Sequence, residues 1–312
     1  MLENRTAYLE GAFVAASEAT LPIMSHSVGR GSAIFDVLSF DETKEGRAVF
    51  RLDEHVARFL HSASVLEMTS PLSAEELQDA VRETVRRNTL KAGAIKITGF
   101  YPEPSLALLP PQKLFQVAIF VFAPDADFGE RSPAGNETVT ALVSRWRRLD
   151  PRTVPIEAKV AANYLNGIVA RTEAKNRGFD YAIMLDSEGN IAEGGTESIF
   201  LVSKGRLLTP NIGHILQGIT RKSVIAVAEA MGIGIFAGAL QEELLNEADE
   251  IFFSGTIHRV LPVGRVGDRI LPGAPGPITN MISARITEIV SGRDQRFGDW
   301  LFPVANSLNI QL

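Results

Sequence analysis

The alternation of apolar and polar residues near the N-terminus predicts two β-hairpins and two further strands. The segment "AYLEGAFVA" has its turn at Glu10-Gly11, and "VLSFDETKEGRAVFRL" has a loop that ends in Gly46. Farther along, "AIKITGFY" and "FQVAIFVF" are apolar runs rich in β-branched and aromatic residues, which favour buried strands. The longest apolar run, "FQVAIFVFAP", is much too short to span a bilayer.

Two amphipathic helices are expected between these strands. In "DEHVARFLHSASVLEM", Asp53 is placed to cap a helix whose apolar face consists of Val56, Phe59, Leu60 and Ala63. In "SAEELQDAVRETVRRN", Ser73 and Glu76 have the spacing of a capping box, and the apolar face consists of Leu77, Ala80, Val81 and Val85. The first part of the chain is therefore predicted to be a mixed α/β domain.

A segment rich in proline, glycine and charge, residues 124–136, is typical of an interdomain loop. Beyond it, strands are predicted at "TALVS", "YAIMLD", "SIFLV", "RLLTP" and "EIFFSG", and helices at "LNGIVARTEAKNRG", "TRKSVIAVAEAMG" and "GPITNMISARITEIVSG". The last helix has Pro277 near its start and Gly292 at its end. Because strands outnumber a simple alternation with helices, we expect two α+β domains, residues 1–123 and 137–312, rather than a doubly wound sheet.

Composition and charge narrow the function classes. The chain has 312 residues and a net charge of −6, which gives no global support for binding nucleic acid or an anionic membrane. The basic run Arg145-Trp146-Arg147-Arg148 is interpreted as a local feature. The absence of cysteine excludes disulfides and thiolate chemistry. The N-terminus has early acidic residues and no signal-peptide core, so we expect a cytoplasmic protein.

Lys159 interrupts a run of small and apolar residues in "IEAKVAANYLNG". Spacing alone favours an ordinary role, either at the surface beside a strand end or as a partner of Glu157. A catalytic role as a Schiff-base amine requires partial desolvation and neighbouring groups that bind the carbonyl partner. Both interpretations stay open on this segment alone.

The segment "DSEGNIAEGGTESIFLV" supplies one such group. A turn from Ser187 to Asn190 precedes Glu193-Gly194-Gly195, and a strand is predicted to leave at Ser198. The small residues around Glu193 would let a flat ring approach closely. A carboxylate there could keep the ring nitrogen of pyridoxal phosphate protonated, although a glutamate beside two glycines is more often an ordinary loop residue.

An anion site is predicted at the start of the helix in "QGITRKSVIAVAEAMG". The apolar stripe of this helix places its start close to Thr220, after the step Gly218-Ile219, so that backbone N–H groups and a hydroxyl lie at the positive helix end. The cluster Ser254-Gly255-Thr256 could close on the same phosphate. Arg58 is either a solvated arginine or a bidentate phosphate partner, and an ordinary capped helix is the alternative for the whole feature.

Five segments in this order resemble one enzyme family: "FRLDEHVARF", "AKVAANYLNG", "EGGTESIFLV", "LQGITRKSVI" and "DEIFFSGT". They are similar to the class IV aminotransferases of fold type IV, which include branched-chain and D-amino-acid aminotransferases, (R)-amine transaminases and aminodeoxychorismate lyases. The resemblance spans nearly the whole chain. It implies a two-domain α+β fold of the D-amino-acid aminotransferase type, with a small N-terminal α/β domain and a larger C-terminal pseudo-barrel domain.

The resemblance also implies a role for each cofactor-binding residue. Lys159 would form the Schiff base with pyridoxal 5'-phosphate and move the proton between the substrate and the cofactor. Glu193 would pair with the pyridine nitrogen, and Tyr164 would hydrogen-bond the ring hydroxyl. Leu216 would pack beneath the ring. The phosphate would be held by Arg58, Ile219, Thr220 and Thr256.

The substrate-facing segment "SHSVGRGSAIFDVLSF" departs from the branched-chain pattern. Arg30 stands where those enzymes usually have a tyrosine and Ser39 where they have an arginine, whereas Phe35 suits their aromatic wall. Arg30 is interpreted as a carboxylate clamp, a gate or a structural salt bridge. Lys96 stands where the family tends to have an arginine. The implied substrate-binding set is Arg30, Phe35, Lys96 and Ile257.

The expected activity is transfer of an amino group from a branched-chain or hydrophobic amino acid to a 2-oxo acid such as 2-oxoglutarate or pyruvate, with (R)-amines as further donors. The alternatives are an (R)-amine or D-amino-acid transaminase, an aminodeoxychorismate-lyase-like enzyme and a non-catalytic binding protein. No metal, nucleic acid or membrane is expected as a partner. Family members are usually homodimers in which a loop of one subunit covers the other's pocket, and the apolar, proline-rich residues 101–113 are the candidate loop.

Overall fold

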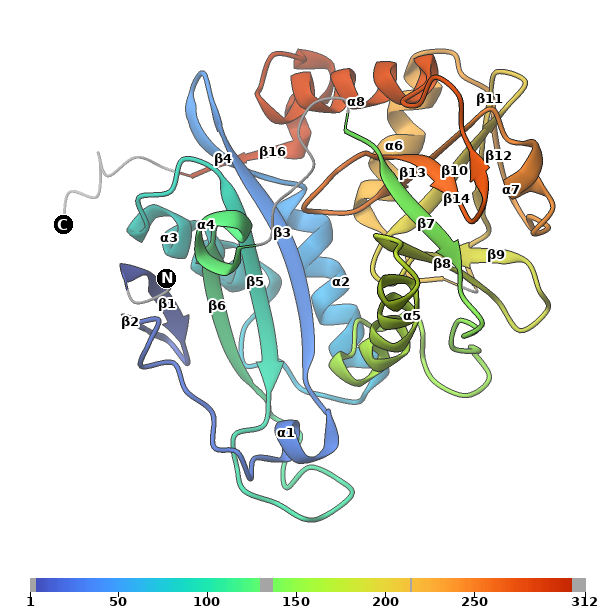
Figure 1. Ribbon diagram of the computed structural model, residues 1–312. Coiled ribbons are helices and arrows are strands. Elements are labelled where there is room, and N and C mark those ends of the chain that lie inside the picture. The colour runs from blue at the N-terminus through green and yellow to red at the C-terminus, as the bar shows by residue number, and fades with distance from the viewer. Residues whose placement is uncertain (1–3, 130–136, 214, 305–312) are drawn as a thin grey trace. The chain divides into compact units, whose positions relative to one another are not determined.

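The structure is a computed structural model of the chain, and it describes residues 4–129, 137–213 and 215–304. It divides into two compact units, each assembled from segments that are distant in sequence. The first consists of Met1–Arg131, Ala158–Ala162 and Glu288–Leu312, and the second of Ser132–Glu157 and Asn163–Thr287. Both units mix strands with helices (Figure 1), as the sequence predicts.

The first unit is built on a sheet whose seven strands are, in spatial order, β16 (Leu301–Pro303), β4 (Gly46–Phe50), β3 (Ile34–Thr43), β5 (Gly93–Phe100), β6 (Gln116–Phe122), β1 (Thr6–Leu9) and β2 (Ala12–Ala15). Every neighbouring pair is antiparallel. The predicted hairpins are confirmed: β1 and β2 turn at Glu10-Gly11, and β3 and β4 pair from Thr43 to Gly46 outward. The strand that closes one edge, β16, comes from the C-terminal part of the chain.

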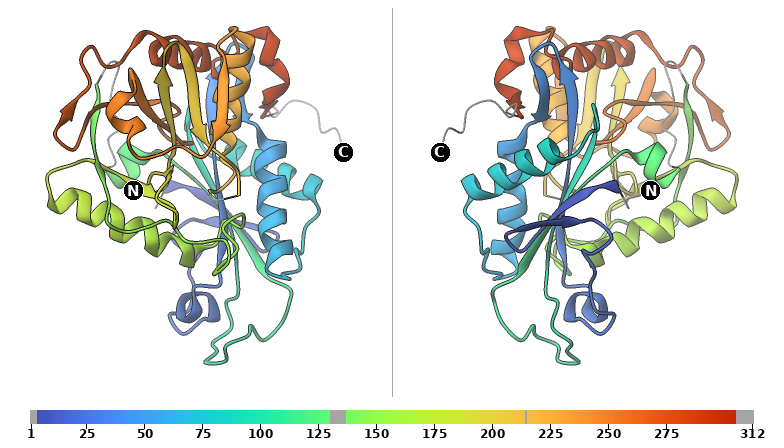
Figure 2. Two further views of the ribbon diagram at one scale, coloured as in Figure 1. Left: turned by 90° about the vertical axis from the view of Figure 1, so that its right-hand side faces the viewer. Right: turned by 90° about the vertical axis from the view of Figure 1, so that its left-hand side faces the viewer.

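Two helices, α2 (Leu52–Val65) and α3 (Ala74–Arg87), pack on one face of this sheet (Figure 2). The capping box is confirmed, because Ser73 accepts from the Glu76 N–H and the Glu76 side chain accepts from the Ser73 N–H. The cap expected at Asp53 is wrong. Arg51, in a left-handed conformation, holds the N-cap position, so the helix starts one residue before Asp53, which lies in the first turn.

A buried charged cluster joins α2 to β3. Asp36 lies on β3 with its side chain fully buried and accepts hydrogen bonds from Nε and Nη2 of Arg58, each at 2.8 Å, and from Nδ1 of His55 at 2.7 Å. Burial opposes ionisation of Asp36, but the charge of Arg58 and the hydrogen bonds from Arg58 and His55 outweigh it and hold the Asp36 pKa well below its usual range. Burial also lowers the pKa of His55.

The second unit is built on a nine-stranded sheet. Eight of its strands run in the order β12 (Ile235–Gly238), β11 (Arg206–Pro210), β10 (Ser198–Ser203), β13 (Glu250–Ser254), β14 (Leu261–Val266), β7 (Val139–Val143), β8 (Tyr181–Leu185) and β9 (Ile191–Glu193), and β15 (Arg269–Ile270) pairs with β14. Its helices are α5 (Tyr164–Asn176), α6 (Ile219–Ala230), α7 (Leu244–Glu247) and most of α8 (Pro277–Val290), whose end from Glu288 onward belongs to the first unit. The predicted strands and helices of this half are confirmed.

The expected division of the chain into residues 1–123, a loop at 124–136 and residues 137–312 stays a prediction of domain organisation. Helix α4 (Pro124–Phe128) occupies the start of the expected loop, and residues 130–136 lie outside the described residues. Contact within the structure also assigns residues 158–162 to the first unit, although they lie in the second half of the sequence. No helix in the described parts of the chain is both long and apolar enough to cross a bilayer.

The buried cluster predicts that stability depends on pH through His55. The folded-state pKa of His55 lies below its ordinary value of 6.5, so below pH 6.5 the unfolded chain binds a proton that the folded chain does not. Stability should therefore fall as the pH is lowered from about 7 to about 5, by up to about 1.4 kcal/mol per pH unit from this group. Denaturant titrations across this range measure the slope.

The matched variant is His55→Asn, which keeps an N–H donor toward Asp36 but does not titrate. Its stability should change less with pH between 7 and 5 than that of the natural chain. Asp36 does not confuse the comparison, because its contribution is lost only below its ordinary pKa of 3.8. Equal slopes for the two proteins would contradict the assignment of a neutral, buried His55.

Candidate active site

Lys159 is held in the first unit by backbone contacts on both sides. Its N–H donates to Oγ of the fully buried Ser62 at 2.9 Å, and its carbonyl accepts from the Phe35 N–H at 3.0 Å. Val160 forms a bridge with Ile34, the first residue of β3. The short segment 158–162 is therefore tied to β3 and α2 by bonds that do not involve the lysine amine.

The amine itself lies against an aromatic ring. Nζ of Lys159 is 5.0 Å from the centroid of the Phe35 ring, and Nζ of Lys96, from β5, is at the same distance from that ring. Desolvation and the charge of Lys159 lower the pKa of Lys96, although part of the Lys96 surface is exposed. Three of the predicted site residues are thus brought together around one ring.

Arg58 is not a solvated arginine, because its side chain is only 11% exposed and it pairs with Asp36. That alternative is therefore wrong. The same helix carries Ser62, whose hydroxyl donates to the Arg58 carbonyl at 2.9 Å and accepts from Lys159. Helix α2 consequently positions both Arg58 and the backbone of Lys159. The phosphate role of Arg58 stays a prediction.

Arg30 ends the short helix α1 (His26–Arg30) and reaches the loop predicted at residues 101–113. Its Nη2 donates to the Leu106 carbonyl at 2.5 Å and its Nε to the Ala107 carbonyl at 3.2 Å. His26 joins the same loop through Nε2 and the Leu108 carbonyl at 3.2 Å. In this structure Arg30 anchors a loop, and its contact with substrate stays a prediction.

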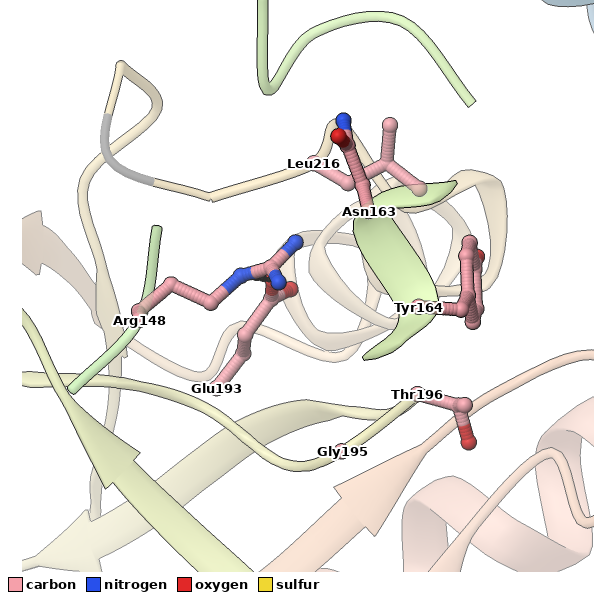
Figure 3. Close-up of a pocket in the computed structure, with 7 residues that line it drawn as sticks. All are labelled: Arg148, Asn163, Tyr164, Glu193, Gly195, Thr196 and Leu216. Atoms are coloured by element: carbon pink, nitrogen blue, oxygen red, sulfur yellow. Dashed lines mark ion pairs between the residues drawn. The ribbon is translucent and has the colours of Figure 1, made fainter. Parts of the chain in front are cut away.

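The second unit contains a pocket that encloses about 280 Å³ of empty space, part of it open to solvent. Figure 3 shows its lining, which comes from the segment after β7, the start of α5, the turn after β9 and the segment before α6. The lining residues are Arg148, Asn163, Tyr164, Glu193, Gly195, Thr196 and Leu216. Of the sequence-predicted residues, Tyr164, Glu193 and Leu216 are brought together here.

Glu193 is the acidic side chain of this pocket, and Arg148 lies against it. The two form an ion pair between Nε of Arg148 and Oε1 of Glu193, with side chains 11% and 8% exposed respectively (Figure 3). Strand β9 ends at Glu193, and Gly194-Gly195 follow, so Glu193 lies at a strand end beside small residues; its pairing with the cofactor stays a prediction. Sequence reasoning missed Arg148 as a site residue, since a run of basic residues is usually a solvated surface.

Glycine is required where α5 meets the turn after β9. A Cβ on Gly167 would collide with the carbonyl oxygen of Gly195, and a Cβ on Gly194 would lie 2.6 Å from a carboxylate oxygen of Glu197. The approach of Gly167 to Gly195 brings the start of α5 beside the turn that follows Glu193, and the approach of Gly194 to Glu197 tightens that turn. The small residues seen in the sequence therefore serve close packing at the wall of the pocket.

The predicted anion site has the expected backbone. Helix α6 starts at Ile219 after Gly218, and no side chain caps its first turn. A Cβ on Gly218 would lie 2.8 Å from Oγ of Ser198, which pairs with Ser254 at the end of β13. Ser254 is 2% exposed, and its hydroxyl has no hydrogen-bond partner within the described residues. Uncapped amides and a buried hydroxyl of this kind suit a phosphate group.

Thr256 and Ile257 follow β13 in a tight turn, in which the Arg259 N–H donates to the Gly255 carbonyl at 2.7 Å. Arg259 has a left-handed backbone in this turn. The turn places Thr256 and Ile257 just past the strand end, where the sequence predicts them. Their contacts with phosphate and substrate stay predictions.

Polar residues at positions where the pattern predicts core could have identified Asp36, His55 and Ser62, which the sequence analysis missed. Asp36 alternates with the buried Ile34 and Leu38 on one face of β3, and His55 and Ser62 fall on the apolar stripe of α2. Polar residues at positions that the period assigns to the core are unusual and mark an internal network. Arg148 carries no comparable signal.

Comparison with known proteins agrees with this geometry. The family model for "Amino-transferase class IV" matches residues 33–266. The branched-chain-amino-acid aminotransferase of Salmonella typhimurium is 33% identical over 300 residues, covering 95% of this chain and 96% of that protein. A probable branched-chain-amino-acid aminotransferase of Aquifex aeolicus is 34% identical over 304 residues, covering 96% of each chain.

Solved structures give the same result. The branched-chain aminotransferase of Thermoproteus uzoniensis, solved with norvaline, superposes with a TM-score of 0.91 at 36% identity, covering 96% of this chain and 99% of that one. The branched-chain amino acid aminotransferase of Thermobaculum terrenum, solved in its PLP-bound holo form, superposes with a TM-score of 0.90 at 27% identity, covering 98% and 100%. The two-domain α+β fold is confirmed. The chain belongs to the class IV aminotransferases and is a pyridoxal-phosphate-dependent transaminase.

Proposed function

We propose that this transaminase moves an amino group from branched-chain or other hydrophobic amino acids to a 2-oxo acid such as 2-oxoglutarate or pyruvate. The observation that carries the proposal is Lys159, whose backbone is held by Ser62 and Phe35 while its amine lies over an aromatic ring. The relatives described above are branched-chain aminotransferases by name, which supports the donor class.

Bound pyridoxal phosphate supplies an aldehyde for the amine of Lys159 and a ring that accepts electrons from the substrate. In the second unit, Glu193 would hold a proton on the ring nitrogen, and Tyr164 would donate a hydrogen bond to the ring oxygen. Leu216 would pack against the ring. Each assignment matches a side chain that the pocket already presents, with a carboxylate, a phenol and an apolar surface in one lining.

The phosphate would lie at the start of α6. The first amides of that helix have no side-chain cap, and Ile219 and Thr220 form its first turn. The buried hydroxyl of Ser254 and the turn at Thr256 supply further donors. Arg58 would add a guanidinium whose orientation is already set by its two hydrogen bonds to Asp36. A fixed guanidinium loses less entropy on binding than a mobile one.

The substrate side would be formed by Phe35, Lys96 and Ile257. Phe35 offers an apolar wall, which suits a branched side chain. Lys96 offers a cation near that wall, which suits a second carboxylate such as that of 2-oxoglutarate. Alternation between an apolar donor and a dicarboxylic acceptor requires both kinds of surface, and Phe35 and Lys96 provide them side by side.

Replacement of Lys159 by alanine should abolish covalent attachment of the cofactor and lower transaminase turnover by more than about a thousandfold. The physical reason is that the variant lacks the amine that bonds to the cofactor aldehyde. Borohydride reduction after incubation with pyridoxal phosphate, followed by intact mass measurement, detects the covalent adduct directly. Lys91→Ala, which removes a lysine that is 79% exposed, is the control. A persistent adduct in Lys159→Ala would refute the assignment.

A donor panel separates the remaining substrate classes. With 2-oxoglutarate or pyruvate as acceptor, kcat/KM should be highest for L-leucine and much lower for D-alanine and (R)-1-phenylethylamine. We expect this order because L-leucine combines a carboxylate with a branched side chain that can pack against Phe35. Absence of turnover with leucine would exclude the branched-chain proposal while leaving the transaminase assignment intact.

We also propose that two copies of the chain associate through the loop at residues 101–113. This loop exposes Leu106, Leu108 and Leu109 by 77%, 82% and 75%, and Ile23 is 82% exposed. Arg30 and His26 hold the loop backbone in place, so these leucines are presented in a fixed arrangement. An exposed apolar patch on a braced loop is typical of an interface.

Replacement of all three leucines by serine should therefore weaken self-association. Sedimentation velocity over a range of protein concentrations should show a dimer for the natural chain and a shift toward monomer for the triple variant. Ile270→Ser and Phe236→Ser, which remove exposed apolar side chains elsewhere, should leave the dimer unchanged. An unchanged sedimentation coefficient in the triple variant would exclude this loop as the interface.

A further inference from the structure

We propose that Arg148 is a positioning residue that keeps Glu193 ionised, so that the proton between Glu193 and the cofactor ring resides on the ring nitrogen. The inference rests on the proposed pairing of Glu193 with that nitrogen and adds a residue to it. Its basis is the Arg148–Glu193 ion pair within the pocket of the second unit.

Arg148 is anchored independently of Glu193. Its backbone N–H donates to the Leu185 carbonyl at 2.8 Å, which fixes it beside β8. Its Nη1 donates to Oδ1 of Asn166 on α5 at 3.3 Å, and the same oxygen accepts the Leu149 N–H at 3.1 Å. The Asn166 amide in turn donates to the Arg147 carbonyl at 2.9 Å. A bond to β8 therefore fixes the backbone of Arg148, and a bond to α5 orients its guanidinium at the pocket.

The contact between Arg148 and Glu193 brings opposite charges together where water is scarce. Nε of Arg148 lies beside Oε1 of Glu193, and both side chains are nearly buried. Both residues also line the pocket, so the pair faces the space that a ligand would enter (Figure 3). A guanidinium in contact with a carboxylate in such surroundings stabilises the ionised form of the acid. Glu193 is thus kept anionic at the wall of the pocket.

A second arginine acts on the same group from farther away. Arg221 on α6 is 3% exposed and donates to Oγ1 of Thr209 at 3.1 Å and to the Pro210 carbonyl at 2.7 Å. Burial lowers the pKa of Arg221, and the negative charge of Glu193 opposes this. These hydrogen bonds of Arg221 go to Thr209 and Pro210, so its effect on Glu193 is that of a nearby charge. Arg148, by contrast, is in direct contact with the Glu193 carboxylate.

The position of one proton follows from this arrangement. A proton between Glu193 and a ring nitrogen can reside on the carboxylate or on the ring. Arg148 touches the carboxylate, so its field disfavours a proton on Glu193 more than it disfavours one on a group beyond Glu193. Loss of the arginine should shift the proton toward Glu193 and leave the ring less positive, which makes it a weaker acceptor of electrons.

The test is the 15N chemical shift of the ring nitrogen in holoenzyme loaded with 15N-labelled pyridoxal phosphate. Arg148→Met should move the resonance toward that of an unprotonated pyridine, and kcat should fall about tenfold with little change in KM. In Arg148→Lys the resonance should lie close to its position in the natural enzyme, because lysine restores the positive charge. The neighbouring Arg147→Met, which removes an exposed arginine, should behave as the natural enzyme.

Glu193→Gln separates failure of this inference from failure of the site assignment. If Glu193→Gln moves the resonance and Arg148→Met does not, the inference is wrong and the pairing of Glu193 with the ring stands. If neither variant moves it, both are wrong. The thermal unfolding midpoint of each variant shows whether it is folded, and Arg148→Lys is the conservative replacement for this comparison. A shift in Arg148→Met that lysine fails to restore would also overturn the inference, because it would reflect packing and not charge.

Discussion

The position of Lys159 depends on a short backbone pairing. Residues 158–162 belong to the first unit, whereas the chain immediately before and after them belongs to the second. The Val160 bridge to Ile34, the carbonyl of Lys159 and the hydroxyl of Ser62 secure this insertion. Because those bonds use only backbone groups of the segment, chemistry at the amine does not disturb its placement. The run that contains Lys159 is thus placed by its backbone pairing with the start of β3.

Each unit contains a buried charge cluster, and the two clusters differ in their surroundings. In the first unit, Asp36 is fully buried and accepts well-formed hydrogen bonds from Arg58 and His55. In the second, Glu193 meets Arg148 at the wall of a pocket. Replacement of a buried ion pair by apolar residues is often neutral or stabilising, so stability gives no strong reason for either cluster. A carboxylate buried inside a unit holds its neighbours still, whereas one that lines a pocket can also meet a ligand.

Local signals in the sequence were sufficient for most elements. The capping box at Ser73, the hairpin at Glu10-Gly11 and the helix start after Gly218 each depend on residues within one turn of one another. Glu193 and Thr220 lie at such element ends, and their roles toward the cofactor stay predictions. By contrast, the Arg30 contacts span 76 and 77 positions, and Arg148 meets Glu193 across several intervening elements. No periodic pattern in the sequence predicts pairings of that kind. The assignment of residues 158–162 to the first unit could not be predicted for the same reason.

The residues proposed to select the substrate also depend on contacts between distant parts of the sequence. Arg30 stands where the family usually has a tyrosine, and in this structure its guanidinium braces the loop at residues 101–113. Lys96 shares the Phe35 ring with Lys159, and burial together with the charge of Lys159 lowers the pKa of Lys96. A substitution of Arg30 would therefore change the loop at residues 101–113 as well as any contact with substrate. A substitution of Lys96 would change the charge beside Lys159 as well as any contact with substrate. The residues proposed for specificity therefore depend on long-range contacts, whereas most of those proposed for cofactor binding lie at element ends.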